Sequence, residues 1–155
     1  MPVDEEIQET AVTSVYHALA VNLHGTTSWF HRVSAAWLAP YDLSLQQYNV
    51  LRILRGQHPR SARASLVQEQ MIDRMSNVSR LIEKLRQKGL IERCTCSFDR
   101  RAVDVTITDK GLALLAVLDE AKEAWLATFE RLTPEEADTL NHLLDKLRGN
   151  DLVAG

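Results

Sequence analysis

The chain has 155 residues, of which 45% are hydrophobic and 25% are charged, and its formal net charge is -3 at pH 7. This length suits one compact domain or one subunit of an assembly, and no apolar run approaches the roughly 20 residues of a membrane span. An acidic N-terminus, with Asp4, Glu5, Glu6 and Glu9, argues against a signal peptide. We therefore expect a cytoplasmic protein that does not contact the membrane.

The N-terminal part, residues 1–40, has the composition of long helices. Apolar residues recur from residue 3 to about residue 23, and Gly25-Thr26-Thr27 then predicts a kink or a short break before a second helical segment, residues 28–38. Pro40 ends this segment, because a residue before proline is pushed away from helical dihedrals. Such long apolar helices can hardly bury themselves alone, so we expect a partner surface.

Two capping boxes predict where the next helices begin. Ser44-Leu45-Gln46-Gln47 precedes a helix of residues 45–55, and Ser65-Leu66-Val67-Gln68 opens a short helix that ends near Met71. Gly56-Gln57-His58-Pro59 breaks the chain between them. Two helices thus precede the most basic stretch of the chain.

The next helix has one apolar and one polar face. Val78, Leu81, Ile82 and Leu85 recur at i, i+3, i+4 and i+7, so this stripe should face the core, and Lys88-Gly89 is a helix stop. The opposite face mixes short hydrogen-bonding groups with cations, a combination that suits base edges and phosphates. It comprises Ser76, Asn77, Ser79, Arg80, Glu83, Lys84 and Gln87.

Two strands are predicted after this helix, over residues 91–96 and 102–107, with a polar and basic turn, Ser97-Phe98-Asp99-Arg100-Arg101, between them. A helix with a polar face followed by a hairpin with arginines at its tip is the outline of a winged helix-turn-helix. Residues 74–101 contain eight Lys or Arg and three Asp or Glu, a net charge of +5 on an acidic chain. This local basic region indicates a nucleic-acid surface. Charge alone leaves open a solvated helix with a surface hairpin.

Helical signals return after the hairpin. Thr108 is the predicted cap of a helix over about residues 109–131, and Thr133-Pro134-Glu135-Glu136 is a further capping box before a last amphipathic helix. Apolar helices at both ends predict a homodimer, the alternative being helices that wrap a monomer. The expected fold is mostly α (α+β): a winged helix-turn-helix with a two-stranded wing over residues 41–108, flanked by dimerisation helices in residues 1–40 and 109–155.

Three segments resemble the MarR family of transcriptional regulators. They are LSLQQYNVLRILRG, similar to the second helix of that family, MSNVSRLIEKLRQKGLIER, similar to its recognition helix and first wing strand, and DRRAVDVTITDKG, similar to its wing tip and second wing strand. The most specific part is Asp99-Arg100-Arg101 followed by Thr108-x-x-Gly111. The resemblance covers most of the chain, and it implies a homodimeric winged helix-turn-helix regulator of double-stranded DNA, usually a repressor, whose DNA affinity is often lowered by a small molecule or by oxidation. The chain departs from the family pattern at residues 71–75, where many members have small residues and a glycine.

Residue roles follow from side-chain chemistry and from the resemblance. Four residues are expected to enter the major groove, where Asn pairs with adenine and Arg with guanine: Ser76, Asn77, Ser79 and Arg80. Arg74 and Lys84 are expected to contact phosphates. By resemblance, Asp99 holds the wing tip and Arg101 reaches the minor groove, while Arg100 shares either task or meets phosphate.

Two groups of residues invite sensing hypotheses. Cys94 and Cys96 suggest thiol-based redox sensing, but their Cα atoms would lie about 6.6–6.8 Å apart on a strand, the long limit for a disulfide, so cysteines without a redox role are favoured. His17, His24 and His31 recur every seven residues, about 10.5 Å apart along a helix, which is too far to share a metal ion. We therefore expect no metal and no other cofactor.

A small-molecule effector is implied only by the resemblance. In the family it often sits between the dimerisation helices and the DNA-binding lobe, a region that would include His24, Trp29, Trp37 and Tyr48, with plain core as the alternative. An enzyme is the least expected class, because the sequence has no Gly-rich phosphate loop, nucleophile elbow or H-E-x-x-H spacing. The rival class is a winged-helix dimer that binds another protein and does not bind an operator.

Overall fold

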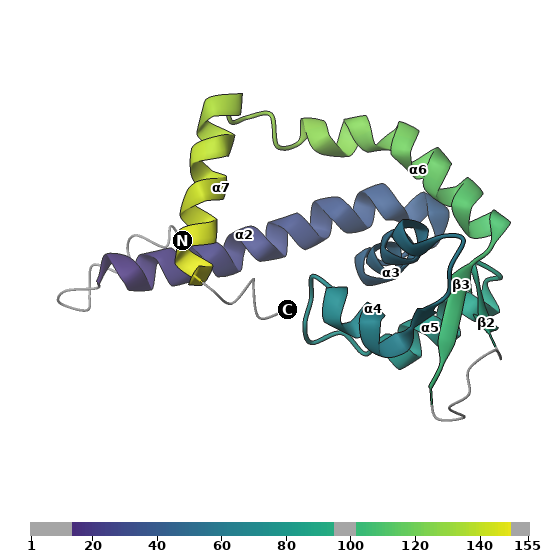
Figure 1. The fold of residues 1–155 in the computed structure, drawn as a ribbon. Coiled ribbons are helices and arrows are strands. Elements are labelled where there is room, and N and C mark those ends of the chain that lie inside the picture. The colour runs from purple at the N-terminus through teal and green to yellow at the C-terminus, as the bar shows by residue number, and fades with distance from the viewer. Residues whose placement is uncertain (1–13, 95–101, 150–155) are drawn as a thin grey trace.

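The computed structural model describes residues 14–94 and 102–149. Two long helices, α2 and α6, extend from a small domain built from α3, α4, α5 and a sheet, and α7 returns from the end of α6 toward α2 (Figure 1). A 3-10 turn, Ala39–Tyr41, joins α2 to α3. The helices are α2 (Val15–Leu38), α3 (Leu45–Gln57), α4 (Ala64–Gln70), α5 (Val78–Gln87), α6 (Asp109–Ala127) and α7 (Pro134–Arg148). None of these helices is both long and apolar enough to cross a membrane.

The sheet has three antiparallel strands in the order β1-β3-β2, formed by β1 (Ala62–Arg63), β2 (Ile91–Cys94) and β3 (Asp104–Ile107). The two wing strands, β2 and β3, were predicted from the sequence. In the structure, Ile91 of β2 pairs with Ile107 of β3. The expected two-stranded wing is confirmed in β2 and β3, and β1 adds a third strand that the sequence did not predict, in which Ala62 pairs with Val105 on the other edge of β3. A two-residue strand is too short to show the alternation by which strands are predicted.

Of the kink or short break expected at Gly25-Thr26-Thr27, the break is wrong, because α2 is continuous from Val15 to Leu38. The Thr27 hydroxyl donates a hydrogen bond to the Leu23 carbonyl oxygen at 2.8 Å, so its side chain is accommodated within the helix. A glycine inside a helix costs only about 1 kcal/mol relative to alanine, which the turns on both sides offset. The start of α2 is capped by Ser14, whose side chain accepts a hydrogen bond from the Tyr16 amide.

Three of the four predicted caps are confirmed. The boxes at Ser44 and Thr133 are complete, and the Thr108 hydroxyl accepts a hydrogen bond from the Gly111 amide at the start of α6. The box at Ser65 is wrong, because α4 already begins at Ala64 and its cap position, Arg63, makes no side-chain cap hydrogen bond. The chain enters this helix directly from β1, so the pairing of β1 with β3 decides where α4 starts.

The core lies between α3, α4, α5 and the sheet, and the C-terminal end of α2 and the N-terminal half of α6 cover it. The predicted apolar stripe of α5 is confirmed, since all four of its residues are buried. The largest fully buried side chains include Leu38 of α2, Leu51 of α3, Leu85 of α5 and Leu115 of α6. Side chains from elements far apart in the sequence thus pack against one face of α5, and the opposite face of this helix lies outside the core.

Candidate nucleic-acid interface

The start of α5 is set by Asn77, which occupies the N-cap position. Its side-chain oxygen accepts a hydrogen bond from the Arg80 amide at 3.2 Å, so this oxygen is committed to the helix cap. Ser76, expected on the polar face, is instead buried with 7% exposure, and its hydroxyl has no hydrogen-bond partner among the described residues. The expectation that Ser76 lies on an exposed base-contacting surface is therefore wrong, because the segment before α5 turns this side chain inward.

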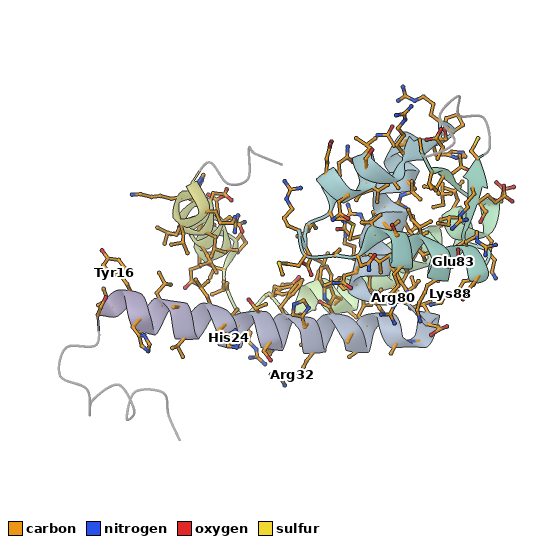
Figure 2. All side chains as sticks on the ribbon, turned by 90° about the horizontal axis from the view of Figure 1, so that it is seen from below. Tyr16, His24, Arg32, Arg80, Glu83 and Lys88 are labelled. Carbon is orange, nitrogen blue, oxygen red and sulfur yellow. The ribbon has the colours of Figure 1, made fainter. Side chains whose placement is uncertain are left out.

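The exposed face of α5 carries the remaining polar residues. Ser79, Arg80 and Lys84 are exposed, and Gln87 follows them near the C-terminal end of the helix. Arg80, Glu83 and Lys88 belong to the small domain, whereas Tyr16, His24 and Arg32 lie along α2 (Figure 2). A hydroxyl and two cations one turn apart on a rigid helix can donate hydrogen bonds to base edges and phosphates.

Glu83 lies on the same helix but pairs with two arginines. Its Oε1 accepts a hydrogen bond from Arg86 at 2.6 Å, and its Oε2 accepts one from Arg93 of β2 at 3.1 Å. The Arg86 hydrogen bond is the main cause that holds the pKa of Glu83 below its usual range. Helical periodicity predicted Glu83 on the polar face of α5, but no local pattern predicted its partner on β2.

The ends of α5 are anchored to other elements. The Lys88 ammonium donates hydrogen bonds to the Asp42 carbonyl oxygen and to Gln47 Oε1, the latter at 3.1 Å, and so ties the C-terminal end of α5 to the start of α3. Arg74, before the helix, is exposed and donates a hydrogen bond to the Glu69 carbonyl oxygen at 2.7 Å. These contacts fix how α5 is presented by the small domain.

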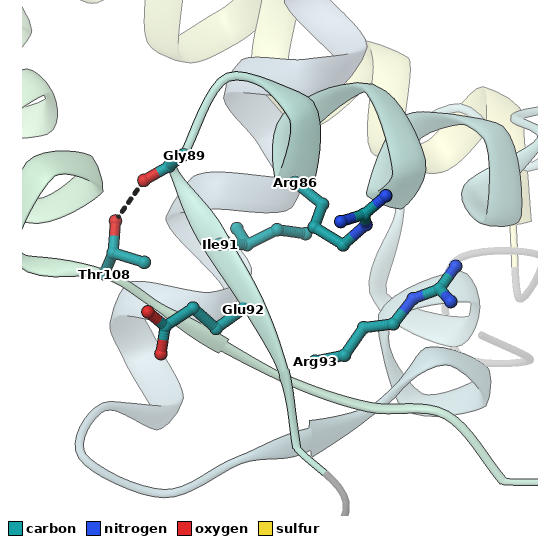
Figure 3. A pocket seen from close by; sticks show the side chains of 6 residues that line it. All are labelled: Arg86, Gly89, Ile91, Glu92, Arg93 and Thr108. Atoms are coloured by element: carbon teal, nitrogen blue, oxygen red, sulfur yellow. Dashed lines mark hydrogen bonds between the residues drawn. The ribbon is translucent and has the colours of Figure 1, made fainter.

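The predicted wing-tip residues Asp99, Arg100 and Arg101, and also Cys96, lie outside the described residues. Cys94, at the end of β2, is a half-buried free thiol. Beside β2, an open pocket is lined by Arg86, Gly89, Ile91, Glu92, Arg93 and Thr108 (Figure 3). No pattern in the sequence predicted this pocket, because its lining residues come from separate elements. Both of its arginines also bind Glu83, so it borders the ion-pair cluster that joins α5 to β2.

Three of the four predicted effector residues, Trp29, Trp37 and Tyr48, belong to one aromatic cluster, and His24 lies apart from it. Trp37 contacts Tyr48 edge to face with ring centroids 5.1 Å apart, while Trp29 packs against Phe129 at 5.7 Å. Trp125 of α6 joins these pairs, since it stacks on Trp37 at 4.7 Å and contacts Phe129 at 5.2 Å. His24 is exposed on α2 and has no place in this cluster.

The aromatic cluster has two polar groups without partners. The Tyr48 hydroxyl and the Trp37 indole N–H are buried and make no hydrogen bond within residues 14–94 and 102–149. Burial is the main cause that raises the pKa of Tyr48 above its ordinary value. By contrast, the Trp125 indole donates a hydrogen bond to Ser34, which is fully buried.

The three histidines at heptad spacing, His17, His24 and His31, are all exposed on α2. Among the described residues, no group of three or more His, Cys, Asp or Glu is placed to hold a metal ion.

Comparison with known proteins gives the following similarities. Residues 43–103 match the model of the MarR family. A MarR transcription factor from Planctomyces limnophilus is 28% identical, with a TM-score of 0.62 over 90% of this chain and 97% of that chain. BpsR from Bordetella bronchiseptica, whose DNA binding is regulated by 6-hydroxynicotinic acid, is 26% identical, with a TM-score of 0.73 over 85% and 99%. A mutant MarR from E. coli complexed with operator DNA is 22% identical, with a TM-score of 0.77 over 90% and 100%, which shows the fold.

Proposed function

We propose that this chain, which belongs to the MarR family of winged-helix regulators, represses transcription by binding a pseudo-palindromic operator in double-stranded DNA as a homodimer. The observation that carries the proposal is the exposed face of α5, where Ser79, Arg80 and Lys84 stand on a helix whose other face is buried. Arg80 donates to base edges, preferably of guanine, and Lys84 neutralises a phosphate. The wing arginines Arg100 and Arg101 add contacts to the minor groove or to phosphates.

The proposed dimer uses the terminal helices. Leu140, Leu143 and Leu147 recur along one face of α7 and are 44–58% exposed, and Val15 and Tyr16 at the start of α2 are more than 75% exposed. Apolar side chains exposed on two helices far from the core indicate an interaction surface. A second copy of the chain would cover this surface and place two α5 helices roughly 34–36 Å apart, one turn of the duplex.

Selection of bound sequences from a random duplex pool at near-physiological salt tests the DNA-binding proposal. We expect an enriched pseudo-palindrome with half-sites one turn apart, and an affinity that falls steeply with salt as phosphate contacts are screened. Arg80→Ala should relax the enriched preference at one base pair of each half-site, whereas Arg32→Ala, which removes an equal charge from α2, should preserve the full enrichment. Absence of both enrichment and salt-dependent binding would refute an operator binder and favour a winged-helix module that binds another protein.

The aromatic cluster supports an effector site as a second element of this function. The unpartnered Tyr48 hydroxyl and Trp37 indole N–H suit a small aromatic acid or phenol that would supply hydrogen-bond partners at the boundary of α2 and α3. Tryptophan fluorescence should detect such a ligand, which should also release the selected operator. Tyr48→Phe should lower the affinity for the ligand, because one hydrogen bond is lost, and should leave operator affinity unchanged. If a ligand binds Tyr48→Phe and releases this variant from the operator as well as it does the wild type, the effector site lies elsewhere.

A further inference from the structure

The turn between α4 and α5 exposes two large apolar side chains. Met75 is 93% exposed and Ile72 is 84% exposed, the highest values for large hydrophobic residues in the part of the chain that the structure describes. Turns are usually built from Gly, Pro, Asn, Asp or Ser, which serve the backbone geometry. Ile72 and Met75 bury almost no surface in this chain, so core packing does not explain why apolar residues occupy these two positions.

This turn is held against α3 by hydrogen bonds from side chains. Asn49 Oδ1 accepts a hydrogen bond from the Ile72 amide at 3.0 Å, and the Asp73 carboxylate accepts one from Gln46 Nε2 at 3.0 Å. Asp73 also accepts a hydrogen bond from the Met75 amide at 2.9 Å. The two apolar residues are therefore presented from a fixed position beside α5. A preorganised position lowers the entropy lost when a ligand binds.

Exposed cations lie close in sequence to these apolar side chains. Met75 lies two residues before Asn77, the N-cap of α5, with Arg74 next to it in the chain and with Arg80 and Lys84 exposed on the helix that follows. A ligand for this region should therefore combine negative charge with small apolar groups. Duplex DNA meets both requirements, because phosphates flank a major groove in which every thymine presents a C5-methyl group.

We propose that the exposed apolar side chains of this turn, Met75 foremost and Ile72 with it, contact thymine C5-methyl groups and add a base preference to each half-site. This inference rests on the proposed function. It goes beyond that function because it assigns base discrimination to apolar contacts of two side chains that have no hydrogen-bond donor. The flexible thioether of Met75 adapts its shape to a methyl group at the edge of a base pair.

Replacement of thymidine by deoxyuridine tests the inference, because it removes one methyl group and keeps every hydrogen-bonding group of the base. Each thymine of the selected operator is replaced in turn, and duplex affinity is measured at fixed salt. Burial of one methyl group is worth about fourfold in affinity, so the wild type should lose about that factor at one or two positions per half-site. Met75→Ala should reduce the loss, and the double variant Ile72→Ala/Met75→Ala should abolish it.

Two further variants separate methyl contacts from other effects. Lys84→Ala should bind every duplex more weakly yet keep the fourfold response to uracil, since it removes a phosphate contact. Met75→Leu should keep the response, because an apolar side chain of similar volume remains. Operator binding with an equal uracil response in the wild type and the double variant would overturn this inference alone. Absence of any duplex binding by the wild type would overturn the proposed function together with it.

Discussion

Glu83 Oε2 on α5 accepts a hydrogen bond from Arg93 Nη2 on β2 at 3.1 Å. Its other oxygen accepts one from Arg86, one turn further along the helix. One carboxylate thus joins the proposed DNA-contacting helix to the base of the wing and offsets part of the positive charge there. The Arg86 hydrogen bond lowers the pKa of Glu83, so this carboxylate keeps its charge to a lower pH than an ordinary glutamate does.

Glu83→Gln should raise the affinity for random duplex DNA. Loss of the carboxylate leaves Arg86 and Arg93 able to pair with phosphates, so the salt dependence should steepen by about 0.9 for each added contact. Binding to a random duplex over a range of salt concentrations measures both quantities. Glu120→Gln on α6 removes an equal charge from another element and should change neither. An unaltered slope in Glu83→Gln would mean that the two arginines do not reach phosphate.

Arg80→Ala and Lys84→Ala should weaken binding in different ways. Loss of Arg80 should cost about 1–3 kcal/mol at one base pair of the operator and relax the preference there. Loss of Lys84 should weaken all duplexes evenly and reduce the salt slope by about 1. Competition between operator and random duplexes at several salt concentrations distinguishes the two patterns. Equal effects of both variants on both duplexes would show that Arg80 does not contact a base.

Gly111→Ala should destabilise the fold, and Gly25→Ala should stabilise it. A Cβ at Gly111 would meet the Leu90 carbonyl oxygen and would lie 2.7 Å from Ile107 Cγ1, where α6 packs against the sheet. Overpacking of this kind typically costs about 1–3 kcal/mol. At Gly25, inside α2, nothing lies within 4 Å of the added Cβ, so the helix should gain about 0.5–1 kcal/mol. Urea unfolding of both variants tests this opposition, and a loss of stability in Gly25→Ala would contradict it.

Asp119→Asn should lower stability in a manner that depends on pH. Arg55 donates a hydrogen bond to Asp119 Oδ2 at 2.7 Å, which links α3 to α6 and is the main cause that lowers the pKa of Asp119. The folded-state pKa lies below the unfolded value, so the pair stabilises the fold above pH 3.9 or so and is lost as the pH falls through the folded pKa. For an exposed pair we expect at most about 1 kcal/mol at pH 7.

Thermal unfolding from pH 7 to pH 3 measures this effect. The difference between the wild type and Asp119→Asn should shrink as the pH falls below about 4. Glu123→Gln, another exposed acidic residue of α6, serves as the matched control. A difference between wild type and Asp119→Asn that stays constant down to pH 3 would show that the ion pair does not contribute.

The sequence by itself determined the elements that depend on nearby residues. The apolar stripe of α5 and the caps at Ser44, Thr108 and Thr133 were predicted because helical periodicity and cap hydrogen bonds act over three or four residues. The alternation around Val105 predicted β3 for the same reason. For the candidate site, these local patterns were sufficient to find the exposed cations of α5.

Only the tertiary structure decided the features that depend on residues far apart in the chain. The strand β1 exists because Ala62 meets Val105, and this pairing also moved the start of α4. Burial of Ser76 and the hydrogen bond that Arg93 donates to Glu83 depend on where neighbouring elements pack, which no local pattern encodes. Side-chain periodicity identifies the face of a helix, but packing decides which residues on that face are exposed, paired or turned inward.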